Sequence, residues 1–289
     1  MRIRALLLAL ALLPAPGRHA TAGEWRGRLF ATTLPAPSMR DTARSVRVYL
    51  PPTYERAEGA KRRYPVVYLL HGWPGGDGNW PGSGHAAETL DSLSERGAIP
   101  EVIAVMPNGN GVGRFGRQEW LDSSDGKARM EAFVWQDLVA WTDRTYRTRP
   151  DSLHRALIGL SEGATGALNI ALKHPGVFNA CGGLSGQYLM TDDWGMKAVW
   201  GDGATAARIR ETNSPALYIG RVANTARRQV IYLDCGVDDE SLADNRAFHR
   251  RLEESGVPHT FVEFPGSHGW GYWKIHLRDA IIACTARMR

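Results

Sequence analysis

Cysteine is scarce in this sequence of 289 residues, which holds only Cys181, Cys235 and Cys284. Three thiols cannot all pair, and their spacing matches no metal-binding or redox motif. Cys181 begins one predicted strand and Cys235 ends the next, so a parallel sheet would place them at opposite ends. We therefore expect buried free thiols, with neither a disulfide scaffold nor a metal site.

Long runs of like charge are also missing. The formal net charge is +5 at pH 7, but residues 1–22 contain three arginines and no acidic residue, which leaves about +2 for the rest. The other basic residues are scattered along the chain. Because nucleic-acid binding needs a concentrated basic surface, we expect no nucleic-acid partner.

No apolar run is long enough to span a bilayer, which takes about 20 residues in a helix. The run "ALLLALALL" at 5–13 follows the basic "MRIR" and precedes the small residues "ATA" at 20–22. This order is typical of a secretory signal peptide. The alternative, a buried first helix, would be expected to show a polar face. We expect that residues 1–22 are removed and that the protein is secreted or periplasmic.

Two patterns alternate along the rest of the chain. Short apolar runs that end in glycine or a polar turn are typical of strands in a buried sheet, and segments with helical spacing lie between them. Besides the strand that begins at Cys181, the expected strands are 45–51, 65–72, 102–109, 155–161, 230–236 and 259–266. The expected helices are 128–146, 163–174, 241–255 and 273–288. This alternation predicts a single α/β domain over residues 23–289, with a mostly parallel central sheet and helices on both faces. Residues 187–228 are less regular, and we expect a cap or a substrate-pocket insertion there.

The pentapeptide "GLSEG" at 159–163 lies where an expected strand meets an expected helix. A serine on such a turn points its hydroxyl into the crevice beyond the carboxyl ends of the strands, where open α/β sheets bind ligands. The flanking Gly159 and Gly163 let the strand and the helix approach closely. Ser161 is therefore a candidate nucleophile, and the alternative is an ordinary serine in a glycine-rich turn.

A nucleophilic serine needs a base, and the base needs an acid that orients it. Of the five histidines after Ser161, His268 lies in the glycine-flanked segment "FPGSHGW" that follows the last expected strand. Four acidic residues end or follow the preceding strand, namely Asp234, Asp238, Asp239 and Glu240. Asp234 is still within that strand, and spacing alone does not separate Asp238 from Asp239.

Two backbone N–H groups are needed to stabilise an oxyanion. One is expected from Glu162, directly after the candidate nucleophile, because the amides at a helix N-terminus favour developing negative charge. The other is expected from Trp73 in the glycine-rich segment "LLHGWPGGDGNW", which follows an early central strand. The alternative for this segment is a surface turn.

Several stretches, taken in order, resemble the esterase D/feruloyl esterase branch of the α/β-hydrolases, whose relatives include S-formylglutathione hydrolases and mycolyltransferases. The stretches that carry the resemblance include "VYLPPTY" (48–54), "YPVVYLLHGWPG" (64–75), "VIAVMPNG" (102–109), "ALIGLSEGATGALNIALKHPGVF" (156–178), "CGVDDE" (235–240) and "FPGSHGW" (264–270). The resemblance implies the α/β-hydrolase fold, assigns the role of the acid to Asp239 and implies no cofactor.

By this resemblance we expect a secreted serine esterase that hydrolyses a carboxylic ester through an acyl-enzyme on Ser161. Four tryptophans lie near the expected site loops and are candidates to stack on a sugar or aryl group, namely Trp73, Trp80, Trp120 and Trp270. Ordinary packing is an equal alternative for each. An acetyl or feruloyl ester on a carbohydrate is the preferred substrate. The alternatives are an acyltransferase that uses a sugar hydroxyl in place of water, and a non-catalytic binding protein.

Glu162 departs from the resemblance, because the family has methionine there in the sequence Gly-Leu-Ser-Met-Gly-Gly. A carboxylate aimed into the site would repel an oxyanion. We therefore expect the side chain to turn away or to pair with a cation. The alternatives are a carboxylate that lines the pocket and selects against anionic substrates, and a solvent-facing or salt-bridged glutamate without consequence for the chemistry.

Overall fold

A single sheet organises the chain. The computed structural model describes residues 25–191 and 195–289, so the expected signal peptide at 1–22 lies outside the described residues. In sheet order, the strands are β1 (Arg28–Ala36), β2 (Asp41–Leu50), β4 (Ile103–Pro107), β3 (Val66–Leu70), β5 (Arg155–Leu160), β6 (Ala180–Leu184), β7 (Val230–Gly236) and β8 (Thr260–Phe264). The pairs β1–β2 and β2–β4 are antiparallel and the other pairs are parallel. The expected mostly parallel sheet is confirmed.

The central strands are almost entirely apolar because both faces of the sheet are covered. Every residue of β3, β4, β5 and β6 is buried. The carboxyl ends of β5 and β6 lie next to each other, since Leu160 is in register with Leu184. These ends form the edge of the sheet where the site residues gather.

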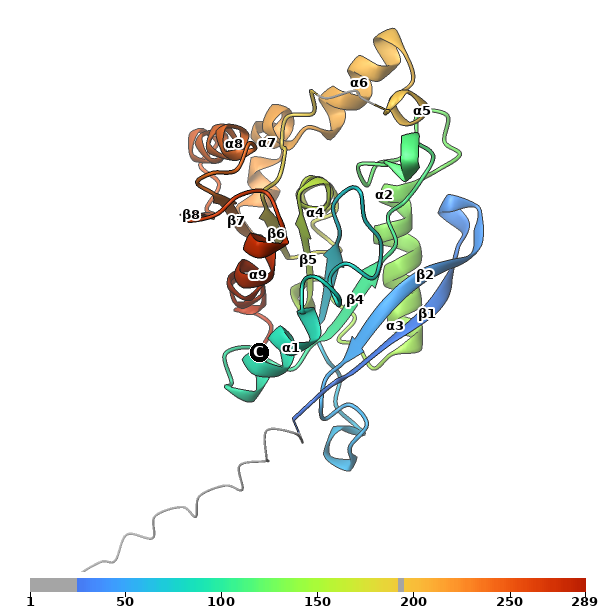
Figure 1. Ribbon diagram of the computed structural model, residues 1–289, viewed down its shortest axis with the longest axis vertical. Helices are drawn as coiled ribbons and strands as arrows, with labels where there is room; N and C mark the ends of the chain where they lie inside the picture. The colour runs from blue at the N-terminus through green and yellow to red at the C-terminus, as the bar shows by residue number, and fades with distance from the viewer. Residues whose placement is uncertain (1–24, 192–194) are drawn as a thin grey trace, which may run out of the picture.

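Helices cover both faces of the sheet (Figure 1). They are α1 (Ala86–Glu95), α2 (Met130–Ala132), α3 (Val139–Thr145), α4 (Glu162–Lys173), α5 (Lys197–Trp200), α6 (Gly203–Asn213), α7 (Pro215–Ala226), α8 (Leu242–Glu254) and α9 (Trp270–Thr285). The α1 and α9 helices contribute apolar side chains to one face, and α4, α7 and α8 contribute to the core on the other. Among the described helices, none has both the length and the apolar character needed to cross a membrane.

Several parts of the chain differ from the expected elements. The β1 strand and the α1 helix were not expected. The expected helix at 128–146 contains a π-helical segment, Phe133–Leu138, between α2 and α3. The described residues of the stretch 187–228 form three helices, of which α7 packs against α4 and α8 as part of the covering layer. A cap stays a prediction for α5 and α6, whose apolar residues Val199 and Trp200 pack with Leu121.

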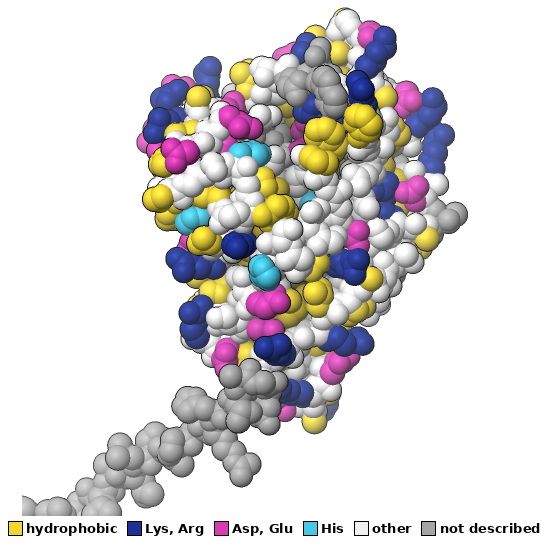
Figure 2. Space-filling view, in the orientation of Figure 1, with side chains coloured by type: hydrophobic (Ala, Val, Ile, Leu, Met, Phe, Trp, Pro, Cys, Tyr) yellow, Lys and Arg dark blue, Asp and Glu magenta, His cyan; other side chains and the backbone are white. Residues whose placement is uncertain are grey.

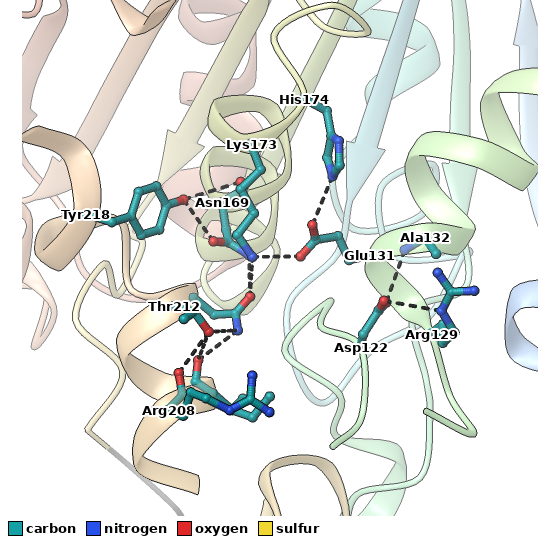
Figure 3. A network of polar contacts seen from close by, with 12 residues as sticks. Asp122, Arg129, Glu131, Ala132, Asn169, Lys173, His174, Arg208, Thr212 and Tyr218 are labelled. Atoms are coloured by element: carbon teal, nitrogen blue, oxygen red, sulfur yellow. Dashed lines mark hydrogen bonds and ion pairs between the residues drawn. The ribbon is translucent and has the colours of Figure 1, made fainter. Parts of the chain in front are cut away.

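A buried polar network attaches the α6–α7 segment to α4 (Figure 3). The Lys173 ammonium donates to the Glu131 carboxylate at 2.9 Å and to the Asn213 side-chain carbonyl at 2.5 Å. Asn169 donates to the same Asn213 oxygen at 3.1 Å and accepts a hydrogen bond from the Tyr218 hydroxyl at 2.9 Å. Because both ends of each contact are partly or fully buried, the network fixes α6 and α7 against the helix that follows the nucleophile turn.

The three cysteines are free and buried, as expected. Burial raises the pKa of both Cys181 and Cys235 to about 12, so these thiols are neutral at ordinary pH. On the molecular face drawn in Figure 2, Lys and Arg side chains alternate with Asp and Glu side chains. Charge is therefore dispersed on that face.

Candidate active site

Ser161 lies on a tight turn between β5 and α4. Its backbone has φ 52° and ψ −125°, a left-handed conformation that is unfavourable for a residue with a side chain. The turn is possible because the strand and helix touch through glycine, since a Cβ atom at Gly159 would lie 2.0 Å from the Gly163 carbonyl oxygen. The Ser161 N–H donates to the Leu184 carbonyl at 2.8 Å, which ties the turn to the end of β6.

His268 and Asp239 lie in line with this serine. The His268 Nε2 atom is 2.9 Å from Ser161 Oγ, and the His268 Nδ1 atom is 3.0 Å from each Asp239 carboxylate oxygen. Asp239 follows β7, and His268 lies in the loop between β8 and α9. The Asp239 side chain is buried and the His268 side chain is 21% exposed. The carboxyl ends of β5, β7 and β8 thus bring together residues that are far apart in the sequence.

The environment of Asp239 keeps it ionised. Burial raises the pKa of Asp239, but the hydrogen bonds from His268 and Ser241 outweigh burial and lower it to about 2. Ser241 donates to Oδ1 from its backbone N–H at 2.8 Å and from its hydroxyl at 2.7 Å. An ionised carboxylate only accepts hydrogen bonds, so it holds the proton of a neutral His268 on Nδ1. The Nε2 atom is then free to accept from the Ser161 hydroxyl.

The other candidate acids lie elsewhere. Asp238 and Glu240 are exposed. Asp234 is fully buried within β7, where its carboxylate accepts a hydrogen bond from the Tyr272 hydroxyl at 2.9 Å. Burial raises the pKa of Asp234 to about 8. The structure therefore places only Asp239, of these four residues, against the imidazole.

A small cavity of about 60 Å³ opens beside Ser161. It is lined by Gly72, Trp73, Pro74, Asn79, Leu160, Ser161, His268, Trp270 and Trp273. Of the four tryptophans that the sequence suggested as substrate-stacking residues, Trp73 and Trp270 line this cavity.

The structure corrects the expectation for Trp80 and Trp120, each only 1% exposed. Their indole N–H groups donate to the carbonyls of Leu70 and His71 at 3.0 Å, so both are packing residues beneath the site. Trp273 was missed, although it follows Trp270 at the i, i+3 spacing that places two residues on one helix face.

The segment that carries Trp73 approaches the nucleophile turn closely. A Cβ atom at Gly72 would lie 3.0 Å from the Ser161 Cβ atom, so only glycine fits there without movement. His71, which sequence reasoning missed, holds the segment from below. Its Nδ1 atom lies 2.8 Å from the Gly72 carbonyl, and its Nε2 atom accepts from the Gly109 N–H at 2.8 Å. Burial lowers the pKa of His71 to about 4, so the ring is neutral.

The Glu162 side chain turns away from this cavity, as expected. Its hydrogen-bond partners, however, were not expected. Its Oε1 atom accepts hydrogen bonds from the backbone N–H groups of Gln118, at 3.3 Å, and Glu119. Burial, followed by the charge of Glu119, raises the pKa of Glu162. The expectations of a pocket-lining or solvent-facing carboxylate are therefore wrong. The Glu162 backbone N–H lies in the first turn of α4, where amides have no acceptor within the helix.

This arrangement provides the groups for acyl transfer. A serine hydroxyl that is hydrogen-bonded to an imidazole, which a buried carboxylate orients, is the geometry that serine hydrolases use. Among the residues that the structure describes, no group of three or more His, Cys, Asp or Glu side chains is arranged to hold a metal ion.

Comparison with known proteins assigns the family. A family model described as "Putative esterase" matches residues 37–284. The chain belongs to this esterase family. The chain is 29% identical over 251 residues to an esterase of Mycobacterium tuberculosis. The match covers 77% of the chain and 52% of that protein. The chain thus spans about half the length of this relative.

Two further matches cover most of the esterase-family chain. It is 28% identical over 314 residues to the diacylglycerol acyltransferase/mycolyltransferase Ag85A of Mycobacterium tuberculosis, covering 93% of the chain and 85% of that protein. A solved ferulic acid esterase is 27% identical with a TM-score of 0.81, covering 92% of the chain and all of the solved protein. The α/β-hydrolase fold expected from the sequence is confirmed.

Proposed function

We propose that this chain is a serine esterase that hydrolyses carboxylic esters through an acyl-enzyme on Ser161. The observation that carries the proposal is the continuous hydrogen-bonded series from Ser161 Oγ through His268 to Asp239, with contacts of 2.9 and 3.0 Å. Membership in the esterase family supports the same reaction class. A non-catalytic binding protein would not need a strained serine held at hydrogen-bond distance from an oriented base.

The reaction begins when His268 Nε2 takes the proton of Ser161 as Oγ attacks the ester carbonyl carbon. The carbonyl electrons move onto oxygen, and the backbone N–H groups of Trp73 and Glu162 stabilise this oxyanion. Asp239 stabilises the imidazolium. As the oxyanion collapses, the bond to the alcohol breaks and His268 returns its proton to the departing alcohol. Water, activated by the same imidazole, then attacks the acyl-enzyme and releases the acid.

The cavity supports a small acyl group. Its volume of about 60 Å³ is a few times the roughly 10–15 Å³ that a single water molecule needs. A short acyl group such as acetyl fits this space more readily than the larger feruloyl group. Indole rings of Trp73 and Trp270 line the cavity and offer apolar faces for stacking. We therefore favour an acetyl ester on a carbohydrate, although the similar solved structure is a ferulic acid esterase.

Export belongs to the same proposal. The signal-like segment at 1–22 supports a secreted or periplasmic enzyme. Expression of the full chain in a Gram-negative host is expected to yield a periplasmic or secreted product that lacks residues 1–22, as measured by intact mass spectrometry. A cytosolic product that retains Met1 would contradict export and would favour cytosolic thioester substrates.

A hydrolysis screen tests the proposed activity. It compares p-nitrophenyl acetate, a feruloyl ester and an acetylated sugar, with Ser161→Ala as the control. Release of acid from at least one ester by the wild type, lost in Ser161→Ala, is the expected result. Equal turnover by both proteins, or failure of a fluorophosphonate to label the wild type, would reject the proposal.

Acyl transfer to a sugar hydroxyl is the second candidate, and the Ag85A acyltransferase relative favours it. The two activities use the same serine, base and acid, and differ in the acceptor that attacks the acyl-enzyme. Product analysis with and without a carbohydrate acceptor separates them. An acylated carbohydrate as the main product would show that acyl transfer, rather than hydrolysis, is the main reaction.

A further inference from the structure

Glu162 carries a buried carboxylate that the proposed reaction does not use. Its Oε1 atom accepts from the backbone N–H groups of Gln118 and Glu119. Its Oε2 atom is buried and has no hydrogen-bond partner among the described residues. A buried carboxylate is costly unless hydrogen bonds compensate it. The contact therefore constrains both the first residue of α4 and the segment 114–120, here called the bracing loop.

The bracing loop has an unfavourable backbone. Three of its residues that are not glycine have left-handed φ angles, 51° at Phe115, 53° at Glu119 and 56° at Trp120. Side chains at such angles cost conformational energy, which the surroundings must compensate. Phe115 is 73% exposed, so packing supports this end of the loop little. The hydrogen bond from the Glu119 N–H to Glu162 is one of the contacts from outside the loop that hold its conformation.

The same loop supports Trp73. The Trp73 indole N–H donates to the Phe115 carbonyl at 3.2 Å, and the Arg117 guanidinium lies 5.7 Å from the centre of the Trp73 ring. Arg117 in turn forms a buried ion pair with Glu119 at 2.5 Å. The bracing loop therefore connects the Glu162 carboxylate on one side with the Trp73 side chain on the other.

We propose that Glu162 is a positioning residue that holds Trp73 beside Ser161 through the bracing loop. The inference rests on the proposed function, in which the backbone N–H groups of Trp73 and Glu162 bind the oxyanion. In this arrangement the side chains of the two residues are linked through one loop, which restrains the positions of their backbone amides. Preorganised donors are effective because they need not move when charge develops.

The charge of Glu162 does not explain its place in the site. The cavity beside Ser161 is lined by other residues. The charged side chains that face the Glu162 carboxylate are Glu119 and Arg117, whose opposite charges largely offset each other. A residue that acts through the loop should affect neutral and anionic esters equally. A residue that selects substrates by charge should affect them differently.

Two substitutions separate the hydrogen-bonding role from the rest of the side chain. Glu162→Gln keeps an oxygen that accepts from the two N–H groups, whereas Glu162→Met keeps the length and removes the acceptor. The matched control is Glu101→Gln. Glu101 is also buried and accepts a backbone hydrogen bond, from Thr53 at 2.9 Å, but it precedes β4 at the opposite end of the sheet.

Kinetics on p-nitrophenyl acetate are measured with each protein confirmed as folded by its thermal midpoint. Glu162→Met is expected to lower kcat by about 10-fold to 100-fold, less than the loss of a whole oxyanion donor, with KM changed less than about threefold. Glu162→Gln should stay within about fivefold of the wild-type kcat. Glu101→Gln should leave kcat unchanged. A Glu162→Met enzyme with the kcat of Glu101→Gln would overturn the inference while leaving the esterase activity established.

A double substitution tests the connection to Trp73 and does not depend on one variant folding well. Trp73→Phe removes the indole N–H that binds the Phe115 carbonyl. If both residues act through the bracing loop, the losses in kcat of Glu162→Met and Trp73→Phe are expected to be less than multiplicative when combined. Multiplicative losses would contradict the connection. An inactive wild type would instead reject the proposed function itself.

Discussion

Asp239 contacts the Nδ1 atom of His268 through both carboxylate oxygens, each at 3.0 Å, while the neighbouring Asp238 is exposed. This difference predicts unequal effects of two adjacent substitutions. Asp239→Asn removes the negative charge that stabilises the imidazolium and is expected to lower kcat by up to about 10⁴-fold. Asp238→Asn should leave kcat within about twofold, a change typical of an exposed side chain. Steady-state kinetics on an aryl acetate measure both, and the reverse order would show that the acid is misassigned.

Ser161 and His268 should behave as one unit. Ser161→Ala and His268→Ala are each expected to lower kcat by up to about 10⁶-fold, and the double substitution should cost little more than either alone. The reason is that the nucleophile is activated only by the base, so either loss stops the same step. Multiplicative losses, measured after removal of wild-type contamination, would mean that the two residues act separately.

The buried strands and the nucleophile turn could be predicted because their signals are local. A strand covered on both faces, such as β5, reads as a continuous apolar run. The turn that follows needs glycine on either side of Ser161 for steric reasons. These requirements are satisfied within a few residues, so they are visible without knowledge of the rest of the fold.

Edge elements were missed because their patterns are weaker. The β1 strand is partly exposed along most of its length and contains Pro35, which a sheet accepts mainly at an edge. In α1, the buried residues Ala86, Leu90 and Leu93 do have helical spacing. That helix is short, however, and lies between glycine-rich and polar segments that read as loop.

The partners of Glu162 could not be predicted from local pattern. Glu119 is 43 positions away in the sequence, and it donates a backbone N–H that every residue except proline carries. The left-handed φ angles at Phe115 and Glu119 occur at residues other than glycine, so the sequence does not signal them. Similarly, Trp80 and Trp270 differ in exposure because of packing, which residue type does not reveal.

Asp234 predicts how stability depends on pH. Burial raises the pKa of Asp234 from 3.8 to about 8, so the folded protein keeps a proton that the unfolded chain has lost. The stabilisation is complete below about pH 4 and is lost as pH rises toward 8, with a slope of about 1.4 kcal/mol per pH unit for one proton. The raised pKa of Glu162 acts in the same direction.

Asp234→Asn should therefore reduce this slope, because asparagine still accepts from Tyr272 but does not titrate. Thermal unfolding measured from pH 4 to pH 8 tests the expectation. Asp238→Asn, at an exposed position, serves as the control and should leave the slope unchanged. An Asp234→Asn slope equal to that of the wild type would show that Asp234 is ionised in the folded protein.

Glu131 predicts a separate effect on stability without an effect on chemistry. Burial raises the pKa of Glu131, but hydrogen bonds and charge from His174 and Lys173 outweigh it, so the pKa is lowered. Its stabilisation is therefore present above the pKa of the unfolded chain and is lost as pH falls through the lower, folded value. Glu131→Gln, at the centre of the network in Figure 3, should destabilise the fold by about 1–3 kcal/mol.

The control for this change is Glu58→Gln, whose partner Arg56 lies 3.9 Å away in an exposed pair. Exposed pairs contribute at most about 1 kcal/mol, so chemical denaturation should scarcely distinguish this variant from the wild type. Both variants should keep the wild-type kcat at temperatures where they are folded. A large loss of kcat in folded Glu131→Gln would mean that the network positions the nucleophile helix as well as stabilising it.

Trp270 should set the size of the acyl group. Its indole lines the cavity of about 60 Å³ and packs edge-on against Trp80 and Trp273, with ring centres 5.5 and 5.4 Å apart. Both neighbouring rings are buried, so on this side of the cavity a larger acyl chain can be accommodated only if Trp270 itself moves or is shortened. Trp270→Ala is therefore expected to raise the kcat/KM ratio of butyrate to acetate esters by about tenfold or more.

Trp141→Ala is the matched control, because Trp141 lies on α3 and packs with Tyr146 away from the cavity. Its butyrate-to-acetate ratio should equal that of the wild type even if its stability falls. Comparing ratios cancels any loss of active protein, so only a change in the space available to the acyl group alters the result. If Trp270→Ala leaves the ratio unchanged, the cavity beside Ser161 holds the alcohol, and the acyl group binds on the open side of the serine.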